Sequence, residues 1–381
     1  MLKPLTLRMP NHVLPSPPYW YKEKKTFEVS EYTTCLGEKI ADLKVGYETY
    51  GNLNALKDNA ILICHYFTGS SNAAGKYKES DLEPGYWNSI IGPDKAIDTN
   101  KFFVISVDSL CNLCVRDPNV VTTGPASINP ATQKKYGFSF PIVGIDDFAK
   151  IQKAVVQSFG IQKLYAAVGP SLGSMQVMQW AGSYPEMVDR VIAVIGGGLD
   201  SPSYLAAMVD LWAAPIYLDP AWNGGDYSAE NFPLEGLKQS LKAMTITCLS
   251  PDWAKMIGGS EFSGGNPREE FSAQYYVQQA LDEVALARLK LMDPNHFLYL
   301  VKAVQNFSVR SQVSKMKSRF LFISAESDLI LLPQYAIDTC RELKARGLDA
   351  EYFEIEGNGG HLDGLYAIGL ASQVIAKFLA R

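Results

Sequence analysis

Residues 164–181, LYAAVGPSLGSMQVMQWA, constrain the fold of this 381-residue chain more than any other stretch. An apolar run predicts a short buried strand, a G-x-S-x-G turn follows, and the residues from 174 onward have the composition of a helix. In such a unit the serine, here Ser171, sits on a sharp turn that pushes its hydroxyl above the sheet. The N–H of Leu172, at the start of the helix, points to where an oxyanion forms. The pattern predicts Ser171 as a nucleophile, the alternative being an ordinary turn that carries a serine.

A serine nucleophile needs a base, and the chain offers only four histidines. His12 lies in a proline-rich leader, His65 precedes the serine, and His296 lies in a helical region. His361 ends the Gly-rich loop GNGGH, which follows a strand-like segment. Such a loop suits a mobile, exposed imidazole, so His361 is the predicted general base and, later in the reaction, the general acid.

The acid that orients the histidine is expected at the end of a strand. Residues 319–325, RFLFISA, predict a buried strand, and the sequence ESD follows it. Active sites of parallel sheets gather at the carboxyl ends of the strands, where Asp328 falls. Glu326 is nearer the strand and is the weaker candidate. The predicted triad is therefore Ser171, His361 and Asp328, with Asp328 orienting the imidazole and stabilising its charged form.

A second loop is predicted to complete the oxyanion hole. Residues 59–64, NAILIC, form a near-continuous apolar run, as expected for a central parallel strand. In folds with this kind of serine turn, the loop after that strand holds the second oxyanion donor. We assign that donor to the backbone N–H of Phe67 and place Thr68 beside the substrate. His65 is predicted to brace this loop rather than to act as a base, because it precedes the serine in the chain.

Charge and cysteine content limit the kind of partner. The formal charge is −5 and the densest basic run is only KEKK at 22–25, so neither nucleic acid nor a membrane surface is expected as a main partner. No apolar stretch is long enough to span a membrane, and six scattered cysteines are typical of reduced thiols, so we expect a cytoplasmic protein. Cys111 and Cys114 form a C-x-x-C pair, but zinc needs about four ligands and no second pair is present. We expect no metal and no bound cofactor.

Strands alternate with helices along most of the chain, which predicts an α/β fold with a mostly parallel central sheet. The proline-rich residues 1–25 are expected to form an extended leader. Between residues 199 and 309 the alternation stops and the sequence becomes largely helical, which predicts an inserted lid over the strand ends. The chain is thus divided into a first core part at 1–198, the lid at 199–309 and a second core part at 310–381.

The clearest helix of the lid is predicted at 268–291. Its candidate inward positions are Phe271, Tyr275, Leu281 and Leu289. Such an apolar stripe indicates core packing or a subunit contact more often than a ligand site.

Several short segments together identify a family. They read GYETYG (46–51), HYFTG (65–69), IGPDKAIDT (91–99), TTGP (122–125), SINPAT (127–132), FP (140–141), SLGSMQ (171–176), DPAW (219–222) and DPN (293–295). On these motifs the chain resembles the homoserine O-acetyltransferase family of α/β-hydrolase-fold enzymes over most of its length. The resemblance implies the α/β-hydrolase fold with an inserted helical lid, and a homodimer formed through lid helices.

The resemblance also implies a reaction. Ser171 takes an acetyl group from acetyl-CoA, the co-substrate, and the freed thiol leaves. The hydroxyl of a small amino acid then attacks the acyl-enzyme with His361 as base. Water must be kept from that intermediate, which is a physical reason for a lid.

The sequence departs from the family pattern where the acceptor amino acid is recognised. Family members carry Asp straight after the catalytic histidine, to hold the substrate ammonium. Here that residue is Leu362, and Asp363, one place later, is the candidate substrate-binding residue. Family members also carry an Arg shortly before the DPxW motif, to pair with the substrate carboxylate, whereas residues 213–216 here read AAPI. Arg116 and Arg310 are alternative sources of that charge.

The sequence favours an acyl-CoA-dependent O-acyltransferase with a Ser-His-Asp triad, with homoserine as the default acceptor and methionine biosynthesis as the implied pathway. An esterase or thioesterase is the alternative, because the same triad and oxyanion hole serve water as acceptor. An acyltransferase with another alcohol acceptor also fits. A protein that has kept the fold without catalysis fits less well, because all three triad positions are filled.

Overall fold

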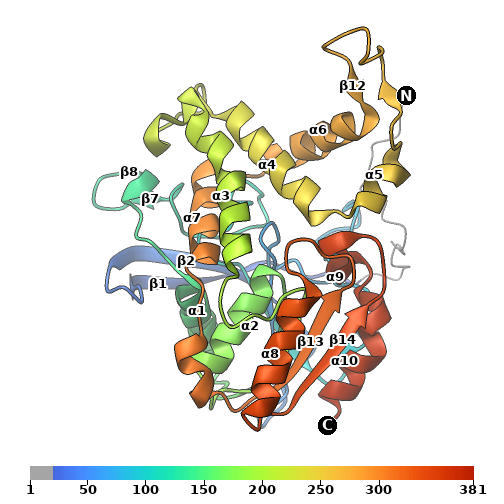
Figure 1. The fold of residues 1–381 in the computed structure, drawn as a ribbon. Coiled ribbons are helices and arrows are strands. Elements are labelled where there is room, and N and C mark those ends of the chain that lie inside the picture. Colours follow the sequence, from blue (N-terminus) through green and yellow to red (C-terminus); the bar gives the residue numbers. More distant parts are fainter. Residues whose placement is uncertain (1–19) are drawn as a thin grey trace.

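The computed structural model describes residues 20–381, and an eight-stranded sheet lies at its centre (Figure 1). The strands run in the order β1-β2-β6-β3-β9-β10-β13-β14, and all neighbours from β6 to β14 are parallel, whereas β1 with β2 and β2 with β6 are antiparallel. The predicted α/β fold with a mostly parallel sheet is confirmed. The strands span Lys25–Thr33 (β1), Lys39–Tyr50 (β2), Ala60–Cys64 (β3), Phe103–Val107 (β6), Leu164–Pro170 (β9), Val188–Val194 (β10), Arg319–Ala325 (β13) and Ala350–Ile355 (β14).

Ten α-helices accompany these strands within residues 20–381. They span Ile145–Ser158 (α1), Leu172–Ser183 (α2), Ser203–Leu218 (α3), Leu234–Cys248 (α4), Pro251–Ile257 (α5), Tyr276–Leu289 (α6), Pro294–Gln305 (α7), Pro333–Ala345 (α8), Asp363–Tyr366 (α9) and Ser372–Leu379 (α10). Short strand pairs lie at Ile91–Gly92 (β4) with Ile97–Asp98 (β5), Ile128–Asn129 (β7) with Lys134–Lys135 (β8), and Phe262–Ser263 (β11) with Gln274–Tyr275 (β12). No single helix in this part of the chain is long and apolar enough to cross a membrane. The bent pair of helical segments Gly360–Tyr366 and Ile368–Leu379 reaches that length and apolar composition only when the two are taken together.

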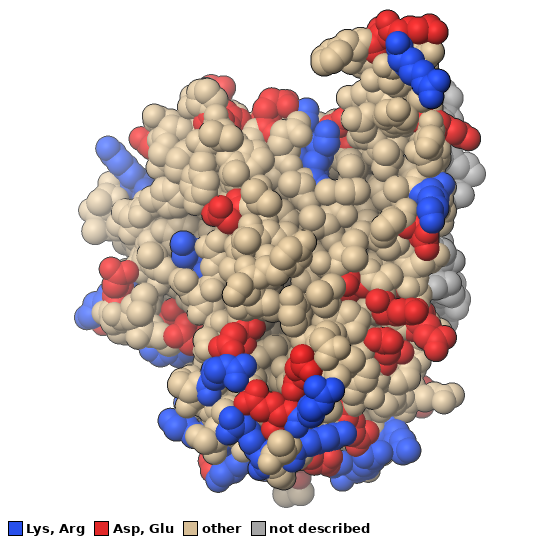
Figure 2. All heavy atoms as spheres, in the orientation of Figure 1, with Lys and Arg blue, Asp and Glu red and all other residues tan. Residues whose placement is uncertain are grey.

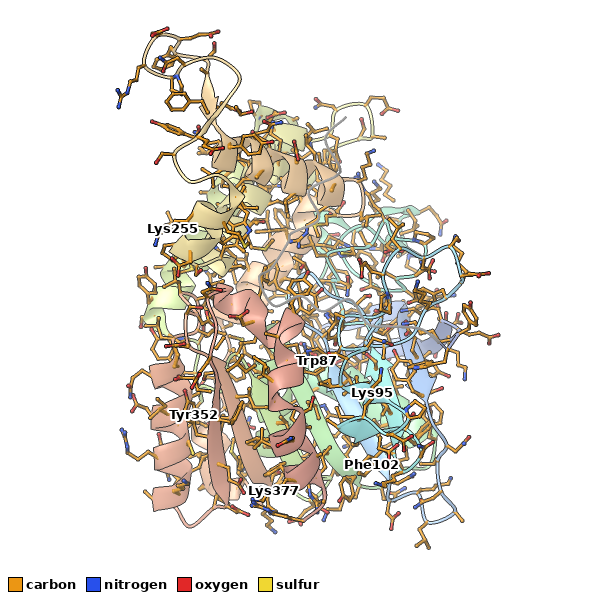
Figure 3. All side chains as sticks on the ribbon, turned by 90° about the vertical axis from the view of Figure 1, so that its right-hand side faces the viewer. Trp87, Lys95, Phe102, Lys255, Tyr352 and Lys377 are labelled. Carbon is orange, nitrogen blue, oxygen red and sulfur yellow. The ribbon has the colours of Figure 1, made fainter. Side chains whose placement is uncertain are left out.

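The sheet has an apolar core on each face because side chains alternate along every strand. On β3, Leu62 packs in the core formed with α1, α2 and α8, whereas Ile61 and Ile63 pack in the opposite core with α10. Trp87, labelled in Figure 3, is fully buried in this second core. Its indole N–H donates to the Gly364 carbonyl at 3.1 Å and so fixes α9, which directly follows the His361 loop.

Helices α3 to α7 lie between β10 and β13 in the chain and stand above the α/β layers in Figure 1. Their position lets them cover the carboxyl ends of the parallel strands. The division of the chain at 199 and 309 stays a prediction. The predicted leader falls mostly on residues 1–19, as does His12, and these lie outside the described residues.

The predicted helix at 268–291 is wrong in its first part. Helix α6 begins only at Tyr276, and Phe271, which we expected to face inward, is fully exposed. Tyr275 instead pairs with Phe262 in the β11–β12 hairpin. Residues 268–273 instead form turns, in which the Glu270 N–H donates to the Asn266 carbonyl and the Ala273 N–H donates to the Glu270 carbonyl, so the apolar spacing there does not reflect a helix.

Candidate active site

The serine turn is built as its sequence predicts. Ser171 joins β9 to α2 with φ 55° and ψ −117°, a backbone conformation that a residue with a side chain rarely adopts. Its N–H donates to the Val194 carbonyl at 2.9 Å, which anchors the turn on β10. A Cβ at Gly169 would collide with the Gly173 carbonyl, and a Cβ at Gly173 would collide with the Cys64 carbonyl. Both glycines of the motif are therefore needed for the close approach of two backbones.

The three predicted triad residues lie in hydrogen-bond contact. His361 Nε2 is 2.7 Å from Ser171 Oγ, and His361 Nδ1 is 2.6 Å from Asp328 Oδ2. The other carboxylate oxygen of Asp328 accepts the N–H groups of Ile330 and Leu331 at 2.8 and 3.0 Å. This arrangement fits a nucleophile, a base and an orienting acid, and the alternative acid, Glu326, is exposed.

The loop that carries His361 differs from the exposed, mobile loop that we predicted. The imidazole is only 5% exposed, because Gly360 packs against the backbone of residues 248–250. Ser327 Oγ donates to the Gly357 carbonyl at 2.8 Å and accepts the Gly360 N–H at 3.0 Å. The histidine is thus held in place by hydrogen bonds on both sides of the loop.

Asp363, the predicted substrate-binding residue, is placed inside this same loop. Its carboxylate is buried and accepts the N–H of Gly359 at 2.8 Å. Burial raises the pKa of this carboxyl above its usual value. Asp363 is absent from the described residues that line the catalytic cavity, so the contacts present indicate a bracing role.

Two backbone N–H groups are available for an oxyanion near Ser171. Within residues 20–381, neither the N–H of Phe67 nor that of Leu172 donates a hydrogen bond. Both residues line the same cavity as Ser171, and so does Thr68. Unused donors at the end of β3 and at the start of α2 are the arrangement that stabilises a tetrahedral oxyanion.

His65 braces the oxyanion loop, as predicted. Its Nε2 accepts the Ser109 N–H at 3.0 Å, and its Nδ1 donates to the Tyr66 carbonyl at 2.8 Å. These partners fix a neutral tautomer, and complete burial lowers the pKa of His65 below its usual value. A neutral, fully bonded imidazole is not available as a general base, so His65 has a structural role.

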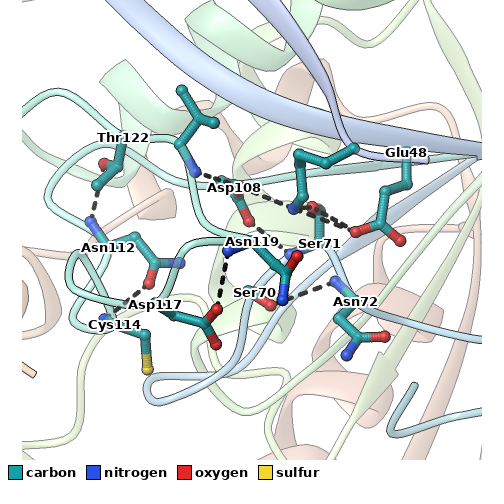
Figure 4. A network of polar contacts seen from close by, with 12 residues as sticks. Glu48, Ser70, Ser71, Asn72, Asp108, Asn112, Cys114, Asp117, Asn119 and Thr122 are labelled. Carbon is teal, nitrogen blue, oxygen red and sulfur yellow. Dashed lines mark hydrogen bonds and ion pairs between the residues drawn. The ribbon is translucent and has the colours of Figure 1, made fainter. Parts of the chain in front are cut away.

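A buried polar network holds the remainder of this loop (Figure 4). Asp108 Oδ1 accepts the Ser71 N–H at 2.6 Å, while its Oδ2 accepts the Val121 N–H at 3.1 Å and pairs with Lys24. Asn112 Nδ2 donates to the Gly69 carbonyl at 2.9 Å. The loop is therefore tied to the ends of β2 and β6 rather than left free to move.

Glu48 forms the buried centre of the same network. Its carboxylate pairs with Lys22 at 2.6 Å and with Lys24 at 3.1 Å. Burial alone would raise the pKa of Glu48, but the two lysines hold it below its usual value. Burial in turn lowers the pKa of Lys22 to about 8. The run KEKK, which had no predicted role, thus supplies the cations that make this network possible.

The catalytic groups open into an inner cavity of about 70 Å³. This is room for about five water-sized groups, which suits a short acyl chain beside Ser171. The wall opposite the triad comes from α3, α4 and α7 and is almost entirely apolar. Its side chains include Leu205, Val209, Trp212, Met244 and Val304.

A larger outer cavity of about 410 Å³ adjoins the inner one. The two share Tyr66, Thr68 and Arg288, together with two residues of α9. The outer cavity is more polar and is lined by the amides and hydroxyls of the loop after β3. A substrate with a long polar part can therefore extend from Ser171 into this space.

Neither arginine that we considered as a substitute for the missing family Arg lies at the cavity. Arg116 lies 3.9 Å from Asp293 and stacks on the Phe232 ring, and Arg310 pairs with Asp200 and Glu342 on the surface. Arg288 of α6 lines both cavities instead. Sequence reasoning missed it because its helix was assigned a generic packing role.

Cys111 and Cys114 are buried free thiols. Cys114 Sγ lies 3.5 Å from the Thr68 carbonyl, and burial raises its pKa to about 12. A thiol that ionises so weakly is a poor metal ligand. Among the described residues, Cys35, Asp146 and Asp147 have ligand atoms close enough to hold an ion, but Asp147 already accepts the Tyr32 hydroxyl and the Cys35 N–H.

The fold and this geometry define a serine-dependent acyl-transferring enzyme of the α/β-hydrolase class. The profile described as alpha/beta hydrolase fold matches residues 59–367. A homoserine O-acetyltransferase of Methanohalobium evestigatum is 37% identical over 94% of this chain and 73% of its own length. A homoserine O-acetyltransferase of Methanococcus vannielii is 33% identical over the same shares of the two chains.

Solved structures agree with these relatives. The homoserine O-acetyltransferase from Bacillus anthracis superposes with a TM-score of 0.90 at 36% identity, covering 95% of this chain and 98% of its own. Esterase E22 superposes with a TM-score of 0.90 at 44% identity, covering 94% of this chain and all of its own. The chain belongs to the homoserine O-acetyltransferase family within the α/β-hydrolase fold.

Proposed function

We propose that this protein transfers an acetyl group from acetyl-CoA to the hydroxyl of L-homoserine by a ping-pong mechanism, as a step of methionine biosynthesis. The observation that carries the proposal is His361, which lies between Ser171 Oγ and Asp328 with two unused N–H groups beside the serine. The relatives named as homoserine O-acetyltransferases support the identity of donor and acceptor.

In the first half-reaction Ser171 Oγ attacks the thioester carbonyl while its proton passes to His361 Nε2. The N–H groups of Phe67 and Leu172 donate to the oxyanion that forms. The carbon–sulfur bond then breaks, the CoA thiol leaves with the proton from His361, and acetyl-Ser171 remains. No bound cofactor takes part in this scheme.

In the second half-reaction the homoserine hydroxyl gives its proton to His361 Nε2 and attacks the acetyl-Ser171 carbonyl. The bond to Ser171 Oγ breaks, Oγ takes the proton back, and O-acetylhomoserine leaves. The apolar wall that faces the triad supports transfer over hydrolysis, because it leaves few groups to hold an attacking water. We propose the segment 199–309 as the lid that supplies this wall.

Ester hydrolysis is the second candidate, and two observations favour it. Leu362 lines the inner cavity at the position where the family carries Asp, and Asp363 is used within the histidine loop. Esterase E22 shares 44% of its sequence with this chain, more than the transferases described above. The triad and oxyanion hole serve either acceptor, so the acceptor must be identified by experiment.

The test is release of free thiol from acetyl-CoA by the purified protein, with no acceptor, with L-homoserine and with L-serine. The proposal expects release to rise steeply with L-homoserine and O-acetylhomoserine to accumulate in equal amount. Slow release that is indifferent to both amino acids, together with rapid cleavage of a neutral acetate ester, would establish the hydrolase. Ser171→Ala serves as the blank for both assays.

We also propose a homodimer formed through the lid. On α3, Tyr204, Leu211 and Leu218 follow one another at seven-residue spacing and are 62%, 68% and 81% exposed. Figure 2 shows few charged side chains over this region, whereas charges gather at the end of the molecule away from the lid. Light scattering should give a dimer for the wild type and a monomer for Leu211→Glu with Leu218→Glu. A monomeric wild type would rule the dimer out.

The six cysteines are all free, which supports a reducing, cytoplasmic location as part of this proposal.

A further inference from the structure

Arg288 is a charged residue at the place where the inner and outer cavities meet. It lies in the last turn of α6, is half-buried, and lines both cavities. Among residues 20–381 it is the one Lys or Arg that lines either of them. A cation held between two cavities, one of which contains the nucleophile, is positioned to meet a substrate.

The guanidinium of Arg288 has no partner among the described residues. It forms no hydrogen bond, and no ion pair within 4.0 Å, with another residue of 20–381. Arg116 and Arg310, by contrast, are already paired with Asp293 and Asp200. A half-buried guanidinium without a partner costs desolvation free energy that an incoming anion would recover.

The positive charge of Arg288 acts on residues of both cavities. Burial raises the pKa of Cys248, in the inner cavity, and of Cys114, in the outer cavity, to about 12 each, and Arg288 opposes both increases. Burial likewise raises the pKa of Tyr66, which lines both cavities, and Arg288 opposes it there too. Arg288 therefore lies close enough to act electrostatically on residues that line both cavities.

We propose that Arg288 binds the carboxylate of the acyl acceptor and takes the place of the arginine that is missing at residues 213–216. This proposal rests on the transferase function proposed above. The planar guanidinium offers two parallel N–H donors that match a carboxylate. In homoserine four bonds separate the carboxyl carbon from the hydroxyl oxygen, and the carboxylate would lie at Arg288, where the inner cavity meets the outer one.

The phosphates of CoA fit this position less well. The whole pantetheine arm separates them from the thioester, so they would lie far beyond the inner cavity. The other charged side chains on the outer cavity, Glu83 and Asp117, are both acidic. Two carboxylates repel a diphosphate, whereas a zwitterionic amino acid carries no net charge.

The experiment compares two acetate esters that acylate Ser171 and differ in charge. O-Acetyl-L-homoserine carries the carboxylate and propyl acetate is a neutral ester with an alcohol part of similar length. Acetylation of Ser171 is followed as release of the alcohol, which requires no acetyl-CoA. The variants are Arg288→Met, Arg288→Lys and the control Arg116→Met, all checked for an unchanged melting temperature.

We expect Arg288→Met to lower kcat/KM for O-acetyl-L-homoserine about 10- to 100-fold and to leave propyl acetate within about two-fold. Arg288→Lys should fall between, because it keeps the charge and loses the paired donors, while Arg116→Met should change neither ester. An unchanged ratio of the two esters in Arg288→Met would overturn the proposal. If Arg288→Met raises the KM for acetyl-CoA but leaves the ratio of kcat/KM for the two esters unchanged, Arg288 binds the phosphates of CoA and the proposal is overturned.

The two proposals fail in different ways. If L-homoserine does not stimulate thiol release by the wild type, the transferase proposal fails. The ratio of kcat/KM for O-acetyl-L-homoserine and propyl acetate still tests Arg288 in that case, because hydrolysis of either ester begins with acetylation of Ser171. Loss of carboxylate preference in Arg288→Met would then support Arg288 as the carboxylate-binding residue of a hydrolase.

Discussion

The two walls of the inner cavity are built in different ways. One wall comes from the ends of β3, β9, β13 and β14, and there the polar atoms of Ser171, His361 and Asp328 each have a defined hydrogen-bond partner. The opposite wall comes from helices α3, α4, α6 and α7, which we proposed above as part of a lid, and is apolar apart from a few groups such as Arg288; we call it the lid wall. The wall formed by the strand ends, called here the sheet wall, thus carries the catalytic groups, and helices α3, α4, α6 and α7 shape the space that a substrate enters. A homoserine O-acetyltransferase and an esterase can therefore share this fold at a TM-score of 0.90.

The largest expected effect on turnover comes from Ser171→Ala, a change in the sheet wall formed by the strand ends. Removal of the hydroxyl leaves no atom to accept the acyl group, so turnover of both acetyl-CoA and a neutral acetate ester should fall at least about 10⁴-fold. Intact-mass spectrometry after mixing with acetyl-CoA should show an added acetyl group on the wild type only. Wild-type turnover in the variant would remove the nucleophilic role.

Asp328→Asn should have the next largest effect. An amide would offer the histidine Nδ1 either a donor or a weaker acceptor, and the imidazolium would lose its counter-charge. We expect turnover to fall about 10³- to 10⁴-fold with little change in KM. Glu326→Gln is the matched control, because its side chain is exposed and should leave turnover unchanged. The reverse outcome would make Glu326 the orienting acid.

Asp108→Asn tests whether the sheet wall depends on its buried supports. The change removes the ion pair with Lys24 and weakens the acceptor of the Ser71 N–H, so the loop that carries Phe67 should shift. We expect turnover to fall about 10-fold and the free energy of unfolding to fall by about 3 kcal/mol. Kinetics and urea unfolding measure the two effects.

The control for Asp108→Asn is Glu28→Gln, which breaks an exposed ion pair with Lys44 far from the loop. It should change neither turnover nor stability measurably. A stability loss in Asp108→Asn with unchanged turnover would mean that the network supports the fold alone. The oxyanion loop would then be positioned by Asn112 and His65.

The difference between the walls also explains what the sequence could reveal. The boundaries predicted for β13 agree with the structure, because it is an apolar segment with clear ends. Parallel strands bring their carboxyl ends to one edge, so Ser171, Asp328 and His361 could be joined without coordinates. The burial of His361 could not be predicted, since it depends on packing against residues 248–250 of the lid.

The lid wall was far less predictable. The predicted helix at 268–291 included strand β12 of the β11–β12 hairpin, and the sequence predicted no role for Arg288 near the end of that helix. Trp212 and Leu205 face the cavity only because of how α3 packs on its neighbours, and local spacing does not specify that angle. Specificity residues on inserted helices therefore need the structure, whereas residues at strand ends do not.

The smallest expected effect is the pH dependence of stability that comes from two buried histidines. One of them supports the sheet wall and the other lies on a helix of the opposite wall. His65 supports the oxyanion loop and His296, on α7, accepts the Ala126 N–H at 3.1 Å. Complete burial lowers the pKa of both. Above pH 6.5 both the folded and unfolded chains hold these groups neutral, so they contribute nothing to the pH dependence. Below pH 6.5 the unfolded chain takes up protons that the folded chain refuses, so stability falls as pH falls.

Each histidine should contribute a loss of up to about 1.4 kcal/mol per pH unit below pH 6.5. Urea unfolding at pH 7.5 and 5.5 should show a smaller pH effect in His65→Gln and in His296→Gln than in the wild type. Turnover at pH 7.5 should fall more in His65→Gln, because the replacement disturbs the Ser109 N–H bond that fixes the oxyanion loop. Equal turnover losses would mean that the lid wall positions this loop as strongly as the sheet does, through the hydrogen bond of His296 to Asn112.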